Sequence, residues 1–408
     1  MKKKNIQIFS KVQFSKDLEI KTMKVGIKSK SKEDVSVVTF KNSANVASVT
    51  TKSKTCAANI SWLKKIKKNG KVKALFVNSG NANAYTGKIG YENVIKIAKN
   101  LAKINNCEKE NIIISSTGVI GEQLPIGKIL KKLLQEFGKK RIEKQNWLSF
   151  AKAIMTTDTF PKVAYKHTYI NKRKYNIIGV SKGSGMIAPN MATMLGFIFT
   201  DAQITSKQLQ QLLKAAVEKS FNNITVDGDT STNDMVNLFS VKNKNKNKIK
   251  DLNKKDFKSF QKDLDEVAIK LAKQIVMDGE GANKIIEIKV KGAINNIQAK
   301  NVAFSIAKSL LVKTAIAGED ANWGRIIMAI GNSSAKVNQK KISIQIGDCM
   351  IIKEGEKNKN YKEIEISKYL KNKEIIISID LYLGKGFSKV WTCDLTKKYI
   401  EINADYRS

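Results

Sequence analysis

Short apolar runs alternate with longer amphipathic stretches between residues 35 and 276. The runs have the length of buried strands and cover residues 35–40, 73–80, 111–119, 176–183 and 194–202. Between them, apolar residues recur at helical spacing, which predicts helices over residues 92–104, 126–137, 206–217 and 256–276. Thr205 or Ser206 is the expected cap of the third helix. Strands that alternate with helices in this way predict a mixed α/β or α+β fold with a layered core.

The pattern changes near residue 285. One helical stretch over 299–311 is followed by four strand-like segments at 325–333, 341–350, 374–384 and 389–406. We therefore expect an α/β core domain over residues 1–285 and a smaller, β-rich C-terminal α/β domain over residues 286–408. The lysine- and asparagine-rich stretch 242–256 is expected to be a surface loop within the first domain.

The net charge of +38, from 74 basic and 36 acidic residues, raises the question of nucleic-acid binding. Only four of the basic residues are arginines, the side chain that reads bases and grips phosphates best. The lysines are spread along the whole chain. This distribution favours solvated surface positions, which could steer anionic substrates, and nucleic-acid binding is kept as a non-enzymatic alternative.

His167 is the only histidine, and the four cysteines stand far apart in the sequence. A Ser-His-Asp or Cys-His mechanism would have to use this one histidine, and histidine-rich metal sites are excluded. We expect no metal and no bound cofactor. Isolated cysteines, the lack of a signal peptide and the lack of an apolar run of about 18 residues together predict a cytoplasmic protein.

Glycine and small polar residues gather in several loops that follow the predicted strands and helices. These loops cover residues 78–87, 115–125, 155–162, 226–234 and 318–325; Pro125 and Pro161 lie in two of them, and Pro189 lies in a further glycine-containing stretch, 182–195. Any one of them is explained by ordinary turn chemistry. Taken together they indicate a set of shaped loops whose backbone amides can approach a ligand.

The bond between Ala192 and Thr193 lies between a glycine- and proline-containing stretch and the predicted strand 194–202. A threonine that becomes an N-terminus by self-cleavage carries its own base, because the free α-amine has a pKa of about 8. Such a residue could act as a nucleophile without a histidine. From spacing alone, the simpler interpretation that Thr193 merely begins a strand is preferred.

Seven motifs, in order along the chain, resemble those of the ArgJ family, the ornithine acetyltransferases or glutamate N-acetyltransferases of arginine biosynthesis. The motifs are SSTGVIGEQLP (115–125), MTTDTFPK (155–162), KGSGMIAPNMATML (182–195), VDGDTSTNDM (226–235), DGEGANK (278–284), GEDANWGRI (318–326) and NADYRS (403–408). The resemblance implies a layered α/β sandwich of the DmpA/ArgJ type, similar to the N-terminal-nucleophile hydrolases. It also implies self-cleavage between Ala192 and Thr193 into an α chain (1–192) and a β chain (193–408).

The reaction implied by the resemblance is ping-pong transfer of an acetyl group from N2-acetylornithine through Thr193 to L-glutamate. Thr193 is the implied nucleophile, and Thr117 and Gly118 form the implied oxyanion hole. The implied substrate-binding residues are Thr156, Lys182, Thr193, Glu280, Asn403 and Ser408. Ser408 stands where the family often has threonine, and it keeps the hydroxyl.

The resemblance also implies small-molecule partners and an α2β2 heterotetramer. Some members use acetyl-CoA as a second acetyl donor, so acetyl-CoA is a candidate co-substrate here. The alternative enzyme is a related aminopeptidase or amidase of the same architecture, which would pass its acyl group to water.

Overall fold

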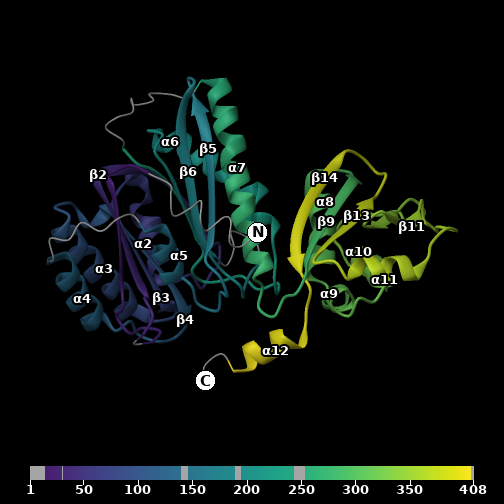
Figure 1. The fold of residues 1–408 in the computed structure, drawn as a ribbon, viewed down its shortest axis with the longest axis horizontal. Helices are drawn as coiled ribbons and strands as arrows, with labels where there is room; N and C mark the ends of the chain where they lie inside the picture. Colours follow the sequence, from purple (N-terminus) through teal and green to yellow (C-terminus); the bar gives the residue numbers. More distant parts are fainter. Residues whose placement is uncertain (1–13, 30, 139–145, 189–193, 243–252, 406–408) are drawn as a thin grey trace. The chain divides into compact units, whose positions relative to one another are not determined.

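The computed structural model describes residues 14–29, 31–138, 146–188, 194–242 and 253–405. Ala192, Thr193, Ser408 and most of the expected surface loop 242–256 lie outside these ranges. The chain forms two compact units (Figure 1). The first comprises residues 1–183, 189–222 and 230–275, and the second comprises residues 184–188, 223–229 and 276–408.

The first unit contains an eight-stranded sheet in the order β4-β3-β2-β8-β7-β6-β5, with β1 paired to β2. The strand β2 changes partners at a register shift between Thr39 and Ala44: β3 pairs on both sides of the shift, and β8 pairs only beyond it. The strands are β1 Leu18–Met23, β2 Val35–Thr50, β3 Lys71–Asn81, β4 Ile112–Val119, β5 Lys162–Ile170, β6 Arg173–Lys182, β7 Leu195–Thr200 and β8 Met235–Ser240.

Helices pack against the β4 end of this sheet and against its strands β2, β8 and β6. The helices α2 (Ala58–Ile66) and α3 (Gly87–Ile104) contact β4, and α4 (Ile126–Gly138) packs on α3 (Figure 1). The helix α6 (Ser206–Lys219) contacts β2 and β8, while α7 (Lys254–Met277) lies against β6. The close approach of α7 needs Gly179, since a Cβ there would stand 2.6 Å from Leu271. The short helix α5 (Trp147–Ala153) contacts β1 and β6.

An aromatic cluster fills the core of the first unit. The rings of Phe199 and Phe239 stack at 4.8 Å, and Phe40 lies 5.4 Å from Phe239. Trp147 of α5 packs 5.0 Å from Phe199. Each buried ring of this size contributes ~1.5–3 kcal/mol of apolar burial, so the cluster ties β2, β7, β8 and α5 together.

The second unit contains a six-stranded sheet in the order β12-β11-β10-β13-β9-β14, in which only β9 and β13 run parallel. Its strands are β9 Ile285–Ala293, β10 Ser343–Ile346, β11 Cys349–Lys353, β12 Glu356–Lys357, β13 Glu374–Asp380 and β14 Gly386–Cys393. Its helices are α8 Asn296–Lys308, α9 Leu310–Ala317, α10 Gly324–Gly331, α11 Glu363–Leu370 and α12 Lys397–Ala404. The helix α8 packs on β9 and β14.

The mixed α/β class expected from the sequence is confirmed, and so are the five strands and four helices predicted before residue 277. Thr205 is the cap of α6, because its side chain accepts a hydrogen bond from the Gln208 amide. The strand prediction for 325–333 is wrong: this segment forms α10, where Ile326, Ala329 and Ile330 are buried at helical spacing.

Two further segments of the C-terminal part differ from the prediction. The expected helix 299–311 is two helices, because Ser309 ends α8 and its side chain caps α9 by accepting from the Val312 amide. The expected strand 389–406 ends at Cys393, and α12 follows with Thr396 as its cap. A local side-chain cap decided the boundary in both cases.

Candidate active site

The two expected oxyanion-hole residues lie at the end of β4. Thr117 pairs in register with Ser79 of β3, and Gly118 pairs with Gly80. Gly118 has a φ of +134°, and a Cβ on it would lie 2.2 Å from the Gly80 carbonyl carbon. The chain therefore needs glycine at this position, and the two backbones meet at the strand end.

Lys182 lies beside this strand end. It is the last residue of β6, and its Nζ donates a 3.1 Å hydrogen bond to Thr117 Oγ1. Lys182 also pairs in register with Leu195, the first residue of β7. The strand that follows the predicted cleavage bond is thus the direct neighbour of the strand that carries Lys182.

Thr156 lies in the loop between α5 and β5 and is half-buried. Its backbone amide donates to Asp158 Oδ2 at 2.9 Å, and the Gly183 amide donates to Asp158 Oδ1 at 2.7 Å. Lys162 Nζ lies 2.5 Å from the same Oδ1, and both side chains of this ion pair are fully buried. One carboxylate therefore joins the loop of Thr156 to the residue after Lys182.

The electrostatics of Asp158 follow from these contacts. Burial alone would raise its pKa, but Lys162, Lys182 and the Gly183 amide outweigh burial and hold the pKa of Asp158 well below its usual range. The carboxylate is therefore ionised at neutral pH. Sequence reasoning missed Asp158 and Lys162, although both lie within the MTTDTFPK motif.

Lys28 is a third residue near the site that the sequence did not indicate. Its Nζ donates to the carbonyls of Met155 at 2.7 Å and Ala153 at 3.3 Å. The pKa of Lys28 is lowered to about 8, mainly by burial; Asp34 and Asp158 oppose this shift, while Lys32 and Lys182 add to it. The lysine lies against Gly80, where a Cβ would come within 2.6 Å of its side chain.

Asp234 precedes β8 and is 3% exposed. Burial raises its pKa well above the usual carboxyl value, and the Met194 amide, Lys182 and Ser231 only partly oppose the shift. Its Oδ2 has no hydrogen-bond partner within the described ranges. The adjacent Asn233 donates from Nδ2 to the Ser116 carbonyl at 2.9 Å, which ties this loop to β4.

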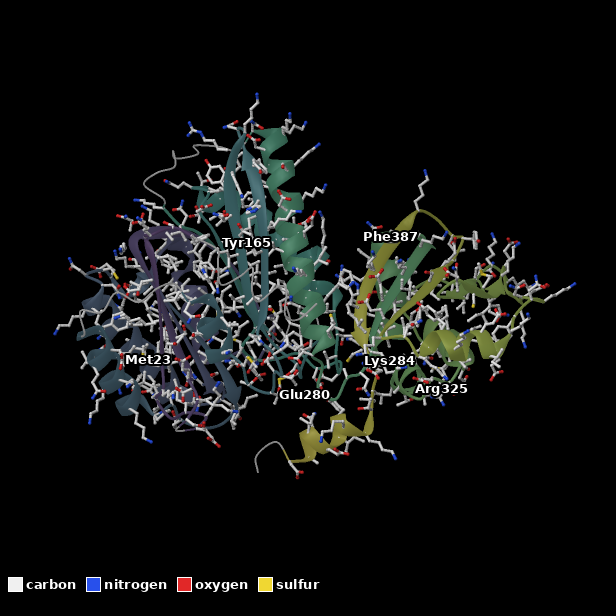
Figure 2. The ribbon with its side chains drawn as sticks, in the orientation of Figure 1. Met23, Tyr165, Glu280, Lys284, Arg325 and Phe387 are labelled. Atoms are coloured by element: carbon white, nitrogen blue, oxygen red, sulfur yellow. The ribbon has the colours of Figure 1, made fainter. Side chains whose placement is uncertain are left out.

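The other predicted binding residues meet within the second unit. Asn403 of α12 donates from Nδ2 to Glu280 Oε2 at 2.9 Å. The side chain of Glu280, which is labelled in Figure 2, belongs to a residue that is 8% exposed. The Glu280 amide donates to the Ser184 carbonyl, and a Cβ on Gly185 would lie 2.3 Å from Glu280 Oε2. Glu280 and Asn403 thus lie against the start of the loop 184–188.

Asp227 fixes the other end of this loop. Its carboxylate accepts hydrogen bonds from the amides of Met186 at 2.5 Å and Ile187 at 2.8 Å. Burial raises the pKa of Asp227, and the carboxylate in turn contributes to a strongly raised pKa of the Tyr399 hydroxyl, where burial is the larger cause. The loop 184–188 is thus held by two carboxylates of the second unit.

The predicted site residues that lie within the described ranges therefore form two groups. Thr117, Gly118, Thr156 and Lys182 lie together in the first unit, and Glu280 and Asn403 lie together in the second. Within the described ranges, no group of three or more His, Cys, Asp or Glu residues could hold a metal ion. The helices in these ranges are too short or too polar to cross a membrane.

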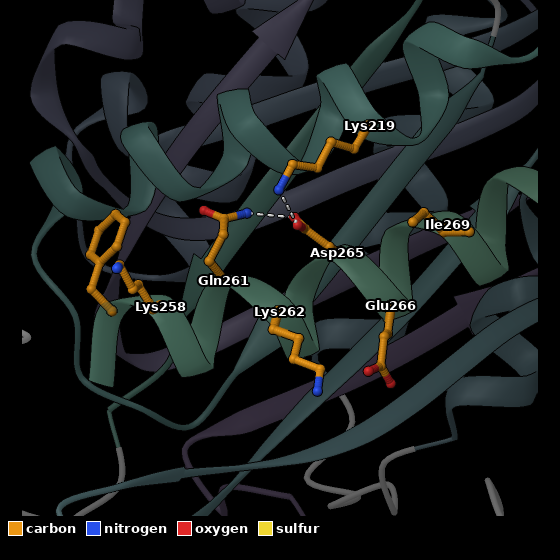
Figure 3. A pocket seen from close by; sticks show the side chains of 8 residues that line it. Lys219, Lys258, Gln261, Lys262, Asp265, Glu266 and Ile269 are labelled. Carbon is orange, nitrogen blue, oxygen red and sulfur yellow. Dashed lines mark hydrogen bonds and ion pairs between the residues drawn. The ribbon is translucent and has the colours of Figure 1, made fainter. Parts of the chain in front are cut away.

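A groove of about 490 Å³ runs between α6 and α7, away from these residues (Figure 3). Three of its polar side chains are paired: Lys219 Nζ lies 2.7 Å from Asp265 Oδ2, and Gln261 Nε2 donates to Asp265 Oδ1 at 2.5 Å (Figure 3). None of the predicted site residues lines it.

Comparison with known proteins gives the family. The model of the ArgJ family matches residues 19–408. The "Arginine biosynthesis bifunctional protein ArgJ" of Bradyrhizobium diazoefficiens is 45% identical over 397 residues, which are 96% of this chain and 95% of that protein. The protein of the same name from Zymomonas mobilis is 43% identical over 391 residues, 96% of this chain and 95% of that one.

A crystal structure of the ArgJ protein from Bacillus halodurans is 46% identical and covers 52% of this chain and all of that one, with a TM-score of 0.49. The match of the family model over nearly the whole length and the two full-length relatives confirm the resemblance seen in the motifs. The chain belongs to the ArgJ family of arginine-biosynthesis acyltransferases.

Proposed function

We propose that this enzyme transfers the acetyl group of N2-acetylornithine to L-glutamate by way of an ester on Thr193. The observation that carries the proposal is the hydrogen bond from Lys182 Nζ to Thr117 Oγ1 at the end of β4. It joins a cation suited to a substrate carboxylate with a hydroxyl suited to an oxyanion. The names of the curated relatives support a role in arginine biosynthesis.

The proposed first step is self-cleavage. Thr193 Oγ attacks the Ala192 carbonyl carbon, the bond to the Thr193 nitrogen breaks, and that nitrogen takes up the hydroxyl proton. Water then hydrolyses the resulting ester and leaves a free Thr193 amine. Two observations support this step: β7 begins at Leu195 between β6 and β8, and Asp227 and Glu280 hold the loop 184–188.

In the proposed transfer, Thr193 Oγ attacks the acetyl carbonyl while the Thr193 amine takes the hydroxyl proton. Thr117 Oγ1 accepts a hydrogen bond from Lys182, so the hydroxyl hydrogen of Thr117 can be donated to a second acceptor. Gly118 supplies a backbone N–H. Together they would stabilise the tetrahedral oxyanion, and each such donor is worth about 10²–10³ in rate. Ornithine leaves with the proton. The amine of glutamate then attacks the ester carbonyl carbon, the bond to Thr193 Oγ breaks, and this oxygen takes up a proton from the attacking amine, which gives N-acetylglutamate and free Thr193.

The remaining residues are proposed to bind the substrates. Lys182 and Thr156 hold the substrate carboxylate, and Glu280 holds the ammonium group, with Asn403 fixing the Glu280 carboxylate. Ser408 supplies a further hydroxyl. The cleaved chains are proposed to assemble as an α2β2 heterotetramer in the cytoplasm. The reaction needs no bound cofactor, and acetyl-CoA is proposed as a second acetyl donor, to be tested with glutamate as the acceptor.

The test is acetyl transfer from N2-acetylornithine by the purified protein with and without glutamate. The proposal predicts formation of N-acetylglutamate and a much faster release of ornithine when glutamate is present. The related aminopeptidase or amidase reaction predicts release of ornithine and acetate at a rate that does not depend on glutamate. That second result would contradict the proposal.

A further inference from the structure

Asp158 contacts the backbone of both segments that are proposed to bind the substrate carboxylate. One oxygen accepts from the Thr156 amide at 2.9 Å, and the other accepts from the Gly183 amide at 2.7 Å. The latter amide belongs to the peptide bond that begins at Lys182. The spacing between the Thr156 loop and the end of β6 therefore depends on one carboxylate.

The peptide bond before Thr156 is held at both ends. Its carbonyl, that of Met155, accepts from Lys28 Nζ at 2.7 Å, while its amide donates to Asp158. A peptide plane with two charged partners has little freedom to rotate. The orientation of the backbone at Thr156 is therefore fixed.

Lys162 supplies the charge that allows Asp158 to remain buried. It begins β5, opposite Ser181 of β6, and its Nζ contacts Asp158 Oδ1 at 2.5 Å. A buried ion pair is weak evidence for a contribution to stability, because an apolar pair of similar size is often as stable. Backbone bonds to both segments indicate a role beyond stability.

We propose that Asp158, through its ion pair with Lys162, is a positioning residue that sets the spacing between Thr156 and Lys182 for the substrate carboxylate. This inference rests on the proposed function. Asp158 touches no reacting atom in this account and acts through the two backbone segments. Its loss should therefore raise the KM for N2-acetylornithine more than it lowers kcat.

The first test is the double variant Asp158→Asn with Lys162→Met. It removes both buried charges together, and asparagine keeps one acceptor oxygen, so at least one of the two backbone amides loses its partner. The expected result is a rise in KM of about tenfold or more, as follows from losing a hydrogen bond to a charged group. The melting temperature, measured alongside, should stay close to that of the wild type.

The matched control is Asp265→Asn with Lys219→Met in the groove between α6 and α7. This pair has the same chemistry at 2.7 Å, with Lys219 exposed and Asp265 largely buried, and it lines a groove that contains none of the predicted site residues. Its KM should equal that of the wild type. A folded Asp158 and Lys162 double variant with a KM within about twofold of this control would overturn the inference.

The second test is a pH profile of the single variant Lys162→Gln. The charged groups that face Asp158 are Lys162, Lys182 and Lys28, so the variant removes one of three cations. Protonation of Asp158 should then begin at a higher pH, and the KM should rise on the acid side while the wild-type KM stays level. Profiles that superimpose would overturn the inference, even if the double variant does not fold.

The outcomes separate the two claims. A wild-type protein without glutamate-dependent transfer contradicts the proposed function. An active wild type together with an unchanged KM in the double variant contradicts only the positioning role of Asp158.

Discussion

Lys182 Nζ donates a 3.1 Å hydrogen bond to Thr117 Oγ1, which joins the end of β6 to the end of β4. The two residues are 65 positions apart in the sequence. Because the bond occupies a lone pair of the hydroxyl and leaves its hydrogen, Thr117 can donate to a developing oxyanion. The relationship therefore couples the proposed carboxylate-binding cation to the proposed oxyanion hole.

Thr117→Val should remove the donor and keep the side-chain volume. We expect kcat to fall by about 10²-fold with a small change in KM, because the lost interaction develops only in the transition state. Steady-state kinetics with N2-acetylornithine and glutamate measure this. Thr168→Val is the control, since Thr168 is buried on β5 and its hydroxyl has no partner in the described part of the chain. Equal kcat values for the two variants would contradict the role of Thr117.

Gly118→Ala should destabilise the first unit as well as the site. A Cβ would lie 2.2 Å from the Gly80 carbonyl carbon, at a φ of +134°, so the backbone of β3 or β4 must move. We expect a loss of several kcal/mol in the free energy of unfolding, measured in urea. Gly121→Ala is the control: it also has a positive φ, +87°, but open space, so it should lose about 1 kcal/mol. Similar losses in both variants would contradict the steric account.

Lys28 should make stability depend on pH in the alkaline range. Its pKa is about 8 in the folded protein, below the usual lysine value of 10.5, so the unfolded chain binds more protons between these values. The stability of the wild type relative to Lys28→Met should therefore rise as the pH increases from about 8 to about 10.5. Urea unfolding of both proteins at several pH values measures the difference. A constant or falling difference would contradict burial as the main influence on Lys28.

Glu280→Gln should weaken binding of the substrate ammonium group. The change keeps the size of the side chain and an oxygen that can accept from Asn403, but removes the charge. We expect the KM for N2-acetylornithine to rise by about tenfold or more, as for other hydrogen bonds to charged groups. Glu401→Gln is the control, because Glu401 of α12 forms an exposed ion pair with Lys398 at 2.8 Å. An unchanged KM in Glu280→Gln would remove Glu280 from the binding site.

The sequence was most informative where local pattern decides the structure. All six residues of β7, Leu195–Thr200, are buried, as a continuous apolar run predicts, and the apolar stripe of α6 begins after its Thr205 cap. The segment 325–333 was wrongly predicted to be a strand because Ile326, Ile327 and Ile330 are of a residue type that favours strands. Only the burial of Ile326, Ala329 and Ile330 at helical spacing selects the helix α10.

The site was predicted only in part for a related reason. The motifs identified Thr117 and Lys182, but they gave no sign that the two would form a hydrogen bond. Asp158 and Lys162 lie inside a motif and were passed over, since Asp158 acts through a contact with Gly183 and Lys162 through a contact with Asp158, and neither contact leaves a sequence pattern. Lys28 reaches Met155 from 127 positions away and is one lysine among many, so no local signal marks it.

The central claim is that Thr193 cuts the chain before it and then serves as the nucleophile. Intact-mass measurement of the purified protein under denaturing conditions tests this most directly, with Thr193→Ala measured in parallel. The account predicts two fragments, residues 1–192 and 193–408, for the wild type, and one uncut, inactive chain for the variant. A wild-type chain that is uncut and fully active would contradict it.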